Sequence, residues 1–227
     1  MINMLIIAIA PTLALLFFIY QKDRYDREPP SLLFKLFIFG ALSVIPVYFI
    51  ERFLTVLNFY NSPLYTAFIV AGLTEETFKY IIVIYVAYKN RHYDEKLDGI
   101  VYSVFVSLGF AGVENILYVL SSGASYISTG ATRAIFSVPA HMLFAITMGY
   151  YLSLARFSRR HGVSKRYSLR ALYVPIILHG IYDYILMAKM VGFFVIFILF
   201  VFYLWRVNLN RLNRYVIESR MDNDELS

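Results

Sequence analysis

The chain has 227 residues, of which 59% are hydrophobic, 18% are aromatic and only 16% are charged. Soluble domains average about 45–50% apolar and about 25% charged residues, so this composition excludes an ordinary soluble domain and indicates a membrane protein. The net charge of +6 lies mostly between apolar stretches, which argues against a nucleic-acid partner, and the absence of cysteine excludes a thiol nucleophile and a disulfide scaffold.

Seven apolar stretches are close to the length of about 20 residues that a helix needs to cross a bilayer. In chain order they are roughly residues 2–20, 31–50, 64–88, 99–120, 131–157, 171–188 and 191–207. The first lacks the basic start and the cleavage site of a signal peptide, so we expect it to be retained. Little more than Lys189 and Met190 separates the last two stretches, which predicts a tight hairpin.

The predicted fold class is therefore all-α, a polytopic transmembrane bundle of about seven helices. The length leaves room for one transmembrane catalytic domain, residues 1–208, and a polar cytoplasmic tail, residues 209–227. We expect the end of the tail, residues 218–227, to be disordered because it is polar and mostly acidic.

Lysine and arginine gather in every second connection between the stretches. The connections after stretches one, three and five, together with the tail, hold Lys22, Arg24, Arg27, Lys89, Arg91, Lys96, Arg159, Arg160, Lys165, Arg166, Arg170, Arg211, Arg214 and Arg220. The intervening connections hold almost none. Because positive charge marks the cytoplasmic side, this alternation predicts an external amino terminus and a cytoplasmic carboxyl terminus.

Ionisable side chains lie inside these stretches at similar predicted depths. They are Glu75 and Glu76 in the third stretch, Glu114 in the fourth, His141 in the fifth, and His179 and Asp183 in the sixth. A charged side chain at the centre of a helix costs about 3 kcal/mol on insertion, so none of these groups can face lipid. Their shared depth predicts one site in the outer half of the bilayer.

Spacing within the helices supports a single site. His179 and Asp183 are four residues apart and share a helix face, where a carboxylate can orient an imidazole. Glu75 and Lys79 have the same spacing, so the ammonium can neutralise that carboxylate. Glu75 and Glu76 point about 100° apart on a helix. We therefore expect them to do different jobs, one facing a cavity.

Several other residues have predicted supporting roles. Asn115 offers an amide for a bond between helices, and Arg133 lies at the outer mouth of its span, where it either snorkels or meets a substrate carbonyl. Small residues allow helices to approach closely around the site; these are Gly72, Gly109, Gly112, Gly149 and Gly180.

Two other classes of function compete with an enzyme at this point. A proton-coupled transporter also places ionisable groups inside a bundle, but no inverted repeat relates the halves of this chain. A non-catalytic scaffold for single-span partners needs no carboxylates and imidazoles at one depth. Taken singly, the Glu–Lys pair and the histidines are also compatible with structural bonds between helices.

A series of short motifs runs along the chain in a specific order. They are Pro11-Thr-Leu-Ala-Leu-Leu16, Lys22-Asp-Arg-Tyr-Asp-Arg-Glu-Pro29, Glu75-Glu76-Thr-Phe-Lys79, Asp98-Gly-Ile-Val-Tyr102, Leu108-Gly-Phe-Ala-Gly-Val-Glu114-Asn115, His141 and His179-Gly-Ile-Tyr-Asp183. From the first span to the sixth, this order resembles the PrsW intramembrane proteases.

Those proteases are similar in turn to the CAAX prenyl proteases and Abi proteins, whose motifs are EExxxR, FxxxH and HxxxN/D. Here Lys79 stands one position before the usual arginine and Glu114 replaces the histidine, so His141 is expected to supply the imidazole.

The resemblance implies a multi-pass protease of the bacterial cell membrane. Its implied action is site-1 cleavage of a single-span membrane anti-sigma factor on the extracytoplasmic side, which starts release of an extracytoplasmic-function sigma factor in a stress response. Glu75 is the expected general base with Glu76 second, and His179 is the third catalytic residue. Glu114, His141 and His179 are expected to hold a zinc ion, with Asp183 as a supporting residue or a ligand in place of Glu114; metal-free oxyanion donation by the histidines is the alternative.

Overall fold

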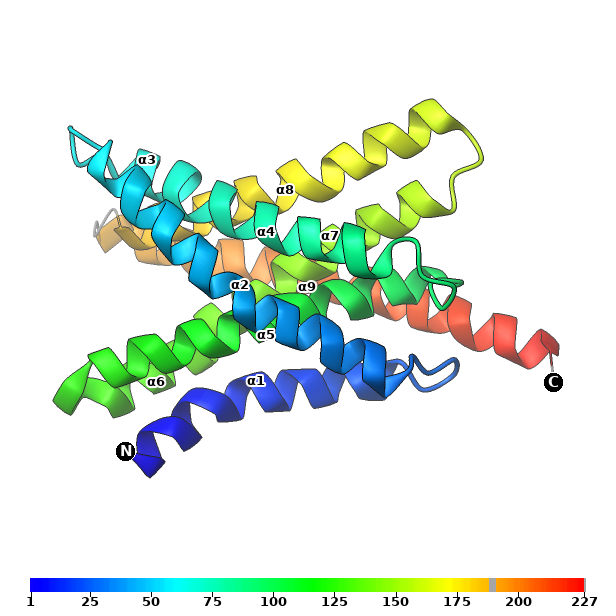
Figure 1. The fold of residues 1–227 in the computed structure, drawn as a ribbon, viewed down its shortest axis with the longest axis horizontal. Helices are drawn as coiled ribbons and strands as arrows, with labels where there is room; N and C mark the ends of the chain where they lie inside the picture. Colours follow the sequence, from blue (N-terminus) through cyan, green and yellow to red (C-terminus); the bar gives the residue numbers. More distant parts are fainter. Residues whose placement is uncertain (188–190, 227) are drawn as a thin grey trace.

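The computed structural model describes residues 1–187 and 191–226, and the regular structure of this part of the chain is entirely helical (Figure 1). The elements are α1 (Ile2–Lys22), α2 (Pro30–Val56), α3 (Pro63–Tyr65), η1 (Thr66–Leu73), α4 (Thr74–Ile82), η2 (Val83–Ala87), α5 (Lys96–Ser121), η3 (Gly123–Ser125), α6 (Tyr126–Ile135), α7 (Ser137–Arg156), α8 (His161–Met187) and α9 (Val191–Leu226). The predicted all-α bundle is confirmed.

Among the described residues, six helical segments are long and apolar enough to cross a membrane: α1, α2, α5, the run from η3 to α7, α8 and most of α9. The remaining predicted stretch, residues 64–88, is helical from Pro63 to Ala87, but its winding changes along its length. The two π-helical stretches η1 and η2 flank the α-helical segment α4. The predicted hairpin at Lys189 and Met190 lies outside the described residues.

Helices α5 and α7 form the centre of the bundle. In the spans that contain α5 and α7, 72% of the residues in the most apolar part are buried. The corresponding share is 17% in α1 and 22% in α9. Glycines let the central helices approach their neighbours closely. A Cβ atom at Gly109 would lie 2.1 Å from the carbonyl oxygen of Phe37, and one at Gly149 would lie 2.1 Å from that of Gly99. No larger residue fits these contacts without a shift of the backbone.

The basic connections meet at one end of the bundle. Lys22 donates to the side chain of Asn213 at 3.2 Å, and Arg156 donates to the carbonyl oxygen of Tyr93 at 2.7 Å. Asn223 donates to the carbonyl oxygen of Tyr25 at 2.7 Å. The start of α1 and the end of α9 lie towards opposite ends of the bundle (Figure 1). This grouping agrees with the alternation of charge, while the side of the membrane on which it lies stays a prediction.

The expectation of a disordered tail is wrong for the described residues, because α9 continues as helix to Leu226. The ring of Tyr215 is buried, and Glu218 pairs with Lys96 at 2.7 Å, so the helix is held against the bundle. At 1.5 Å per residue, α9 is about 54 Å long, well beyond a hydrocarbon core of about 30 Å. Helix also replaces part of the expected connection before residue 131, where α6 begins at Tyr126.

Candidate active site

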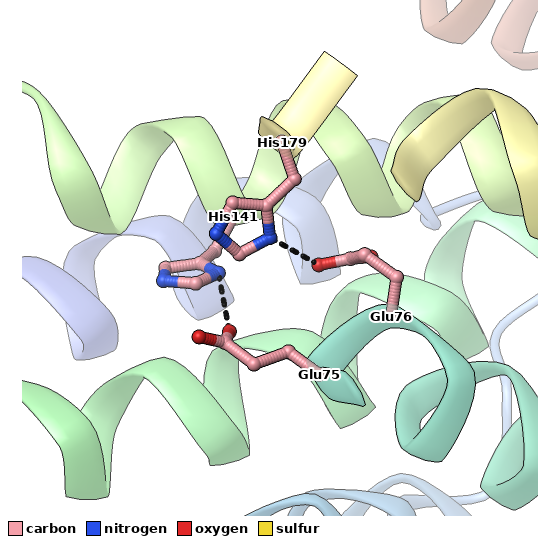
Figure 2. Close-up of side chains that lie close together, drawn as sticks. All are labelled: Glu75, Glu76, His141 and His179. Carbon is pink, nitrogen blue, oxygen red and sulfur yellow. Dashed lines mark hydrogen bonds and ion pairs between the residues drawn. The ribbon is translucent and has the colours of Figure 1, made fainter. Parts of the chain in front are cut away.

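The predicted site residues come together between helices α4, α5, α7 and α8. Figure 2 shows Glu75 and Glu76 of α4 pointing towards His141 of α7 and His179 of α8. All four side chains are buried, and the rings of the two histidines lie 5.4 Å apart between centroids. The clustering expected from shared depth is therefore present in the fold.

The ammonium of Lys79 contacts three of these four side chains. It donates to Glu75 Oε2 at 3.0 Å and to Glu76 Oε1 at 2.7 Å, and it lies 3.1 Å from Nδ1 of His141. The predicted pair with Glu75 is present, and the pair with Glu76 adds to it. The ammonium also sits 4.4 Å from the ring centroid of Phe110. One buried cation is thus shared by two carboxylates and an imidazole.

The contact with Lys79 sets the tautomer of His141. An ammonium has hydrogens but no lone pair, so Nδ1 of His141 must accept the bond. The proton of the neutral ring then sits on Nε2, which donates to Glu114 Oε2 at 3.1 Å. Glu114 also accepts from Arg133 at 2.6 Å. Glu114 therefore orients His141 from the side opposite Lys79.

His179 lies between two carboxylates. Its Nδ1 is 3.0 Å from Glu76 Oε1, and its Nε2 is 3.4 Å from Asp183 Oδ2. The expected contact between positions four residues apart on α8 is present. The ring of Phe144 stacks on the imidazole at 5.1 Å between centroids, with 23° between the planes. The plane and the rotation of the His179 ring are both determined by these neighbours.

The two adjacent glutamates occupy different surroundings, as their helical angle predicts. A cavity of about 690 Å³ is lined by Glu75, and also by Glu114, His141, His179 and Asp183. Glu76 does not line the cavity and is fully buried behind it. The cavity extends to residues at the ends of two helices, Thr55 of α2 and Ser121 of α5. It therefore connects the site with the predicted extracytoplasmic end of the bundle.

Sequence reasoning missed Glu51, which also lines the cavity. The predicted second span ended at residue 50, whereas α2 continues to Val56; the Glu51-Arg52 pair directly after the apolar run was the available signal. Arg133 does not snorkel, because it donates to Glu114 and to Asn115; it also lines the cavity, so its contact with a substrate carbonyl stays a prediction. The Asn115 amide forms the predicted bond between helices, to the carbonyl oxygen of Ala8 at 2.7 Å.

The residues present suit a bound metal ion. One donor atom from each of Glu75, Glu76, His141 and His179 lies within 4.8 Å of the other three. Imidazole nitrogens and carboxylate oxygens are ligands that zinc accepts. The Oε2 atom of Glu76 is buried without a hydrogen-bond partner among the described residues. The group differs from the predicted set in having two glutamates of α4 where Glu114 was expected.

Comparison with known proteins agrees with this geometry. A family model described as PrsW family intramembrane metalloprotease matches residues 28–207. Proteins named Protease PrsW are similar to the chain: that of Clostridioides difficile (strain 630) is 40% identical, covering 96% of this chain and 94% of its own length. Those of Geobacillus kaustophilus (strain HTA426) and Bacillus subtilis (strain 168) are 42% and 41% identical, covering 83% and 79% of this chain and 82% and 81% of their own lengths.

No solved structure matches the chain. The family match extends over most of the chain, and the candidate site lies within the matched residues. With its apolar helices, this makes the protein a multi-pass bacterial membrane hydrolase rather than a transporter or a scaffold. The chain belongs to the PrsW family of intramembrane metalloproteases.

Proposed function

We propose that this protease cuts a single-span membrane anti-sigma factor near the extracytoplasmic end of its span, and so starts release of a sigma factor. The observation that carries the proposal is a group of two carboxylates and two imidazoles beside a cavity, with one donor atom of each within 4.8 Å of the others. The cavity runs from this group to the helix ends that the charge pattern assigns to the outer face. A peptide bond close to that face is therefore the proposed position of cleavage.

Glu75 is the proposed general base, because it lines the cavity while Glu76 does not. A carboxylate in a protein interior can take a proton from the attacking water and deliver it to the leaving amide nitrogen. The water oxygen forms the new bond to the carbonyl carbon, and the C–N bond breaks as the nitrogen gains its proton. Lys79, which bonds to both glutamates, limits the repulsion between them.

Glu76, His141 and His179 are the proposed zinc ligands, since three protein ligands with an open position are usual for catalytic zinc. His141 would bind through Nδ1, in place of its present contact with Lys79. Bound zinc would polarise the scissile carbonyl and lower the pKa of a bound water. The surrounding carboxylates keep the imidazoles in place: Glu114 contacts His141 and Asp183 contacts His179. Such partners typically raise metal affinity about 10–100-fold, which gives Glu114 and Asp183 a positioning role.

The test is cleavage by purified protein reconstituted in liposomes, with a panel of single-span anti-sigma factors and an unrelated single-span protein as substrates. We expect cleavage of an anti-sigma factor on the outer side, its loss with Glu75→Gln, and its loss with a zinc chelator. Glu218→Gln is the matched control, because it makes the same chemical change at the other end of the bundle.

Cleavage of the unrelated protein but of no anti-sigma factor would overturn the substrate assignment and leave the protease in place. Full activity in metal-free protein would overturn the zinc assignment. Unchanged activity in the Glu75→Gln variant would overturn the role of Glu75 as general base.

A further inference from the structure

A second group of carboxylates lies at the other end of the bundle from the active site. Asp23 directly follows α1, Glu95 directly precedes α5, and Asp98 stands in the first turn of α5. One oxygen atom from each lies within 4.8 Å of the other two. Asp98 and Glu114 are near opposite ends of α5, about 24 Å apart at 1.5 Å per residue, so this group is separate from the active site.

Backbone amides hold one oxygen of each aspartate and leave the other without a donor. The N–H of Glu28 donates to Asp23 Oδ2 at 3.1 Å, and those of Asp94 and Glu95 donate to Asp98 Oδ2 at 2.9 and 2.8 Å. The Oδ1 atoms of Asp23 and Asp98 are buried and accept no hydrogen bond from the described residues. Both side chains are fully buried, so water does not reach these atoms.

No cation pairs directly with this group among the described residues, although the Arg27 charge acts on Asp23 from farther away. None of the ion pairs formed within residues 1–187 and 191–226 includes Asp23, Glu95 or Asp98. Burial raises the pKa of Asp23 and that of Glu95 to about 7, which reflects the cost of leaving these carboxylates charged. Buried carboxylates are otherwise found paired or bound to a metal ion.

We propose that Asp23, Glu95 and Asp98 bind a hard divalent cation, Mg²⁺ or Ca²⁺, which ties the end of α1 to the start of α5. Such ions take oxygen ligands almost exclusively, and two or three carboxylates are a common protein contribution to their sites. Glu28 and Asp94 form an overlapping group with Asp98, so further oxygen atoms lie beside the site. The ion would join two connections that the charge pattern assigns to the cytoplasm.

The test uses full-length protein in detergent, freed of metal with a chelator and held above pH 7, so that the pH exceeds the pKa of Asp23 and that of Glu95. Calorimetry with MgCl₂ or CaCl₂ measures binding, and thermal unfolding is followed in parallel. We expect one saturable ion per chain and a rise in Tm that depends on its concentration. The same rise is expected in a His179→Ala background, because the active site does not contribute to it.

Asp23→Asn and Asp98→Asn keep the acceptor for the backbone amides but remove one charge. We expect each to weaken binding at least about 10-fold, yet to melt at a higher temperature than the wild type in chelator, because repulsion is relieved. Asp26→Asn is the matched control: it removes a charge from the same connection, but its side chain is exposed and outside the group. It should leave binding unchanged.

Absence of saturable binding of either ion by the wild type would overturn the proposal, as would equal binding by the wild type and both aspartate variants. A wild-type Tm that follows pH but ignores both ions would also overturn it, because the carboxylates would then share protons instead of a metal. Glu95→Gln provides a further variant if Asp98→Asn does not fold.

Discussion

Glu75 and Glu76 are adjacent in sequence but meet different surroundings, and this difference separates their proposed roles. Glu75 reaches the cavity, whereas Glu76 is enclosed by Lys79 and His179. Their helical positions predicted a difference of this kind. These positions did not predict that Lys79 contacts both carboxylates, because the conformation of a flexible lysine side chain depends on the helices that pack against it.

We predict that Glu75→Gln abolishes proteolysis but leaves zinc bound. Loss of a general base typically costs about 10²–10⁴ in rate, while the three proposed ligands stay in place. Cleavage assays and metal analysis of the same purified sample test this. If Glu75→Gln lost both activity and zinc, Glu75 would be a zinc ligand. Glu76→Ala is the comparison, because we expect it to lose both activity and zinc.

His179→Ala and His141→Ala are each expected to lower zinc content and activity together. Zinc ligands act as a set, so loss of one empties the site rather than adjusting it. If the histidines only donate to an oxyanion, each loss should cost about 10²–10³ in rate, and chelators should have no effect. Metal analysis beside chelator-treated kinetics distinguishes the two mechanisms, and membrane fractionation checks that each variant is still inserted.

A third prediction concerns pH in the presence of chelator. Burial raises the pKa of Asp23, of Glu28 and of Glu95 to about 7, above the usual value of about 4. The folded state then binds more protons than the unfolded state between these values, so these three groups should lower Tm as the pH rises from about 4 to about 7. The fall should be smaller in Asp23→Asn. A Tm that rises through this range would contradict the assignment.

At the scale of the elements, close contacts between helices depend on glycine. The sequence showed which apolar stretches carry small residues but not which partner each one meets. Gly109 faces the backbone of Phe37 on α2, a pairing that only the packed bundle defines. Similarly, apolar length predicted seven spans, whereas the continuation of α9 is accompanied by contacts between residues far apart in the chain, such as the stacked rings of Tyr150 and Tyr215, 5.3 Å apart between centroids.

Gly109→Ala is expected to destabilise the protein by about 1–3 kcal/mol, because its Cβ would lie 2.1 Å from a backbone oxygen and α2 and α5 would have to separate. The measurement is Tm in detergent. Gly162→Ala is the matched control, since nothing lies within 4 Å of its Cβ position in the first turn of α8. Equal Tm values for the two variants would show that α2 and α5 can separate at Phe37 without a measurable loss of stability.

At the scale of the whole molecule, charge alternation and bundle geometry are two independent observations. The basic connections meet at one end of the fold, and the active-site cavity extends towards the other. The placement of Lys and Arg in the sequence could predict that the basic connections meet at one end. Residue counts could predict the depth of the site. The sequence could not predict the cavity, because Glu51, Phe110 and Tyr118 line it from helices whose rotation is set by packing.

A reporter fused after Gly123 should be active outside the membrane, and one fused after Val163 should be active in the cytoplasm. The prediction follows from the alternation of Lys and Arg. The opposite result at both positions would invert the bundle and place the cavity on the cytoplasmic side. A result on the same side for both fusions would mean that the segment η3 to α7 does not cross.

The helix that carries Glu75 is wound as π-helix on both sides of the motif, at Thr66–Leu73 and Val83–Ala87. Each bond in such a stretch spans five residues instead of four, so the stretch holds extra chain within a continuous helix. In an ordinary membrane helix, deleting one residue rotates everything beyond it by about 100°. Here the loss of one residue from a π-helical stretch can be compensated if that stretch winds as α-helix instead. The length of this span can therefore change at these two stretches while Glu75, Glu76 and Lys79 keep their contacts.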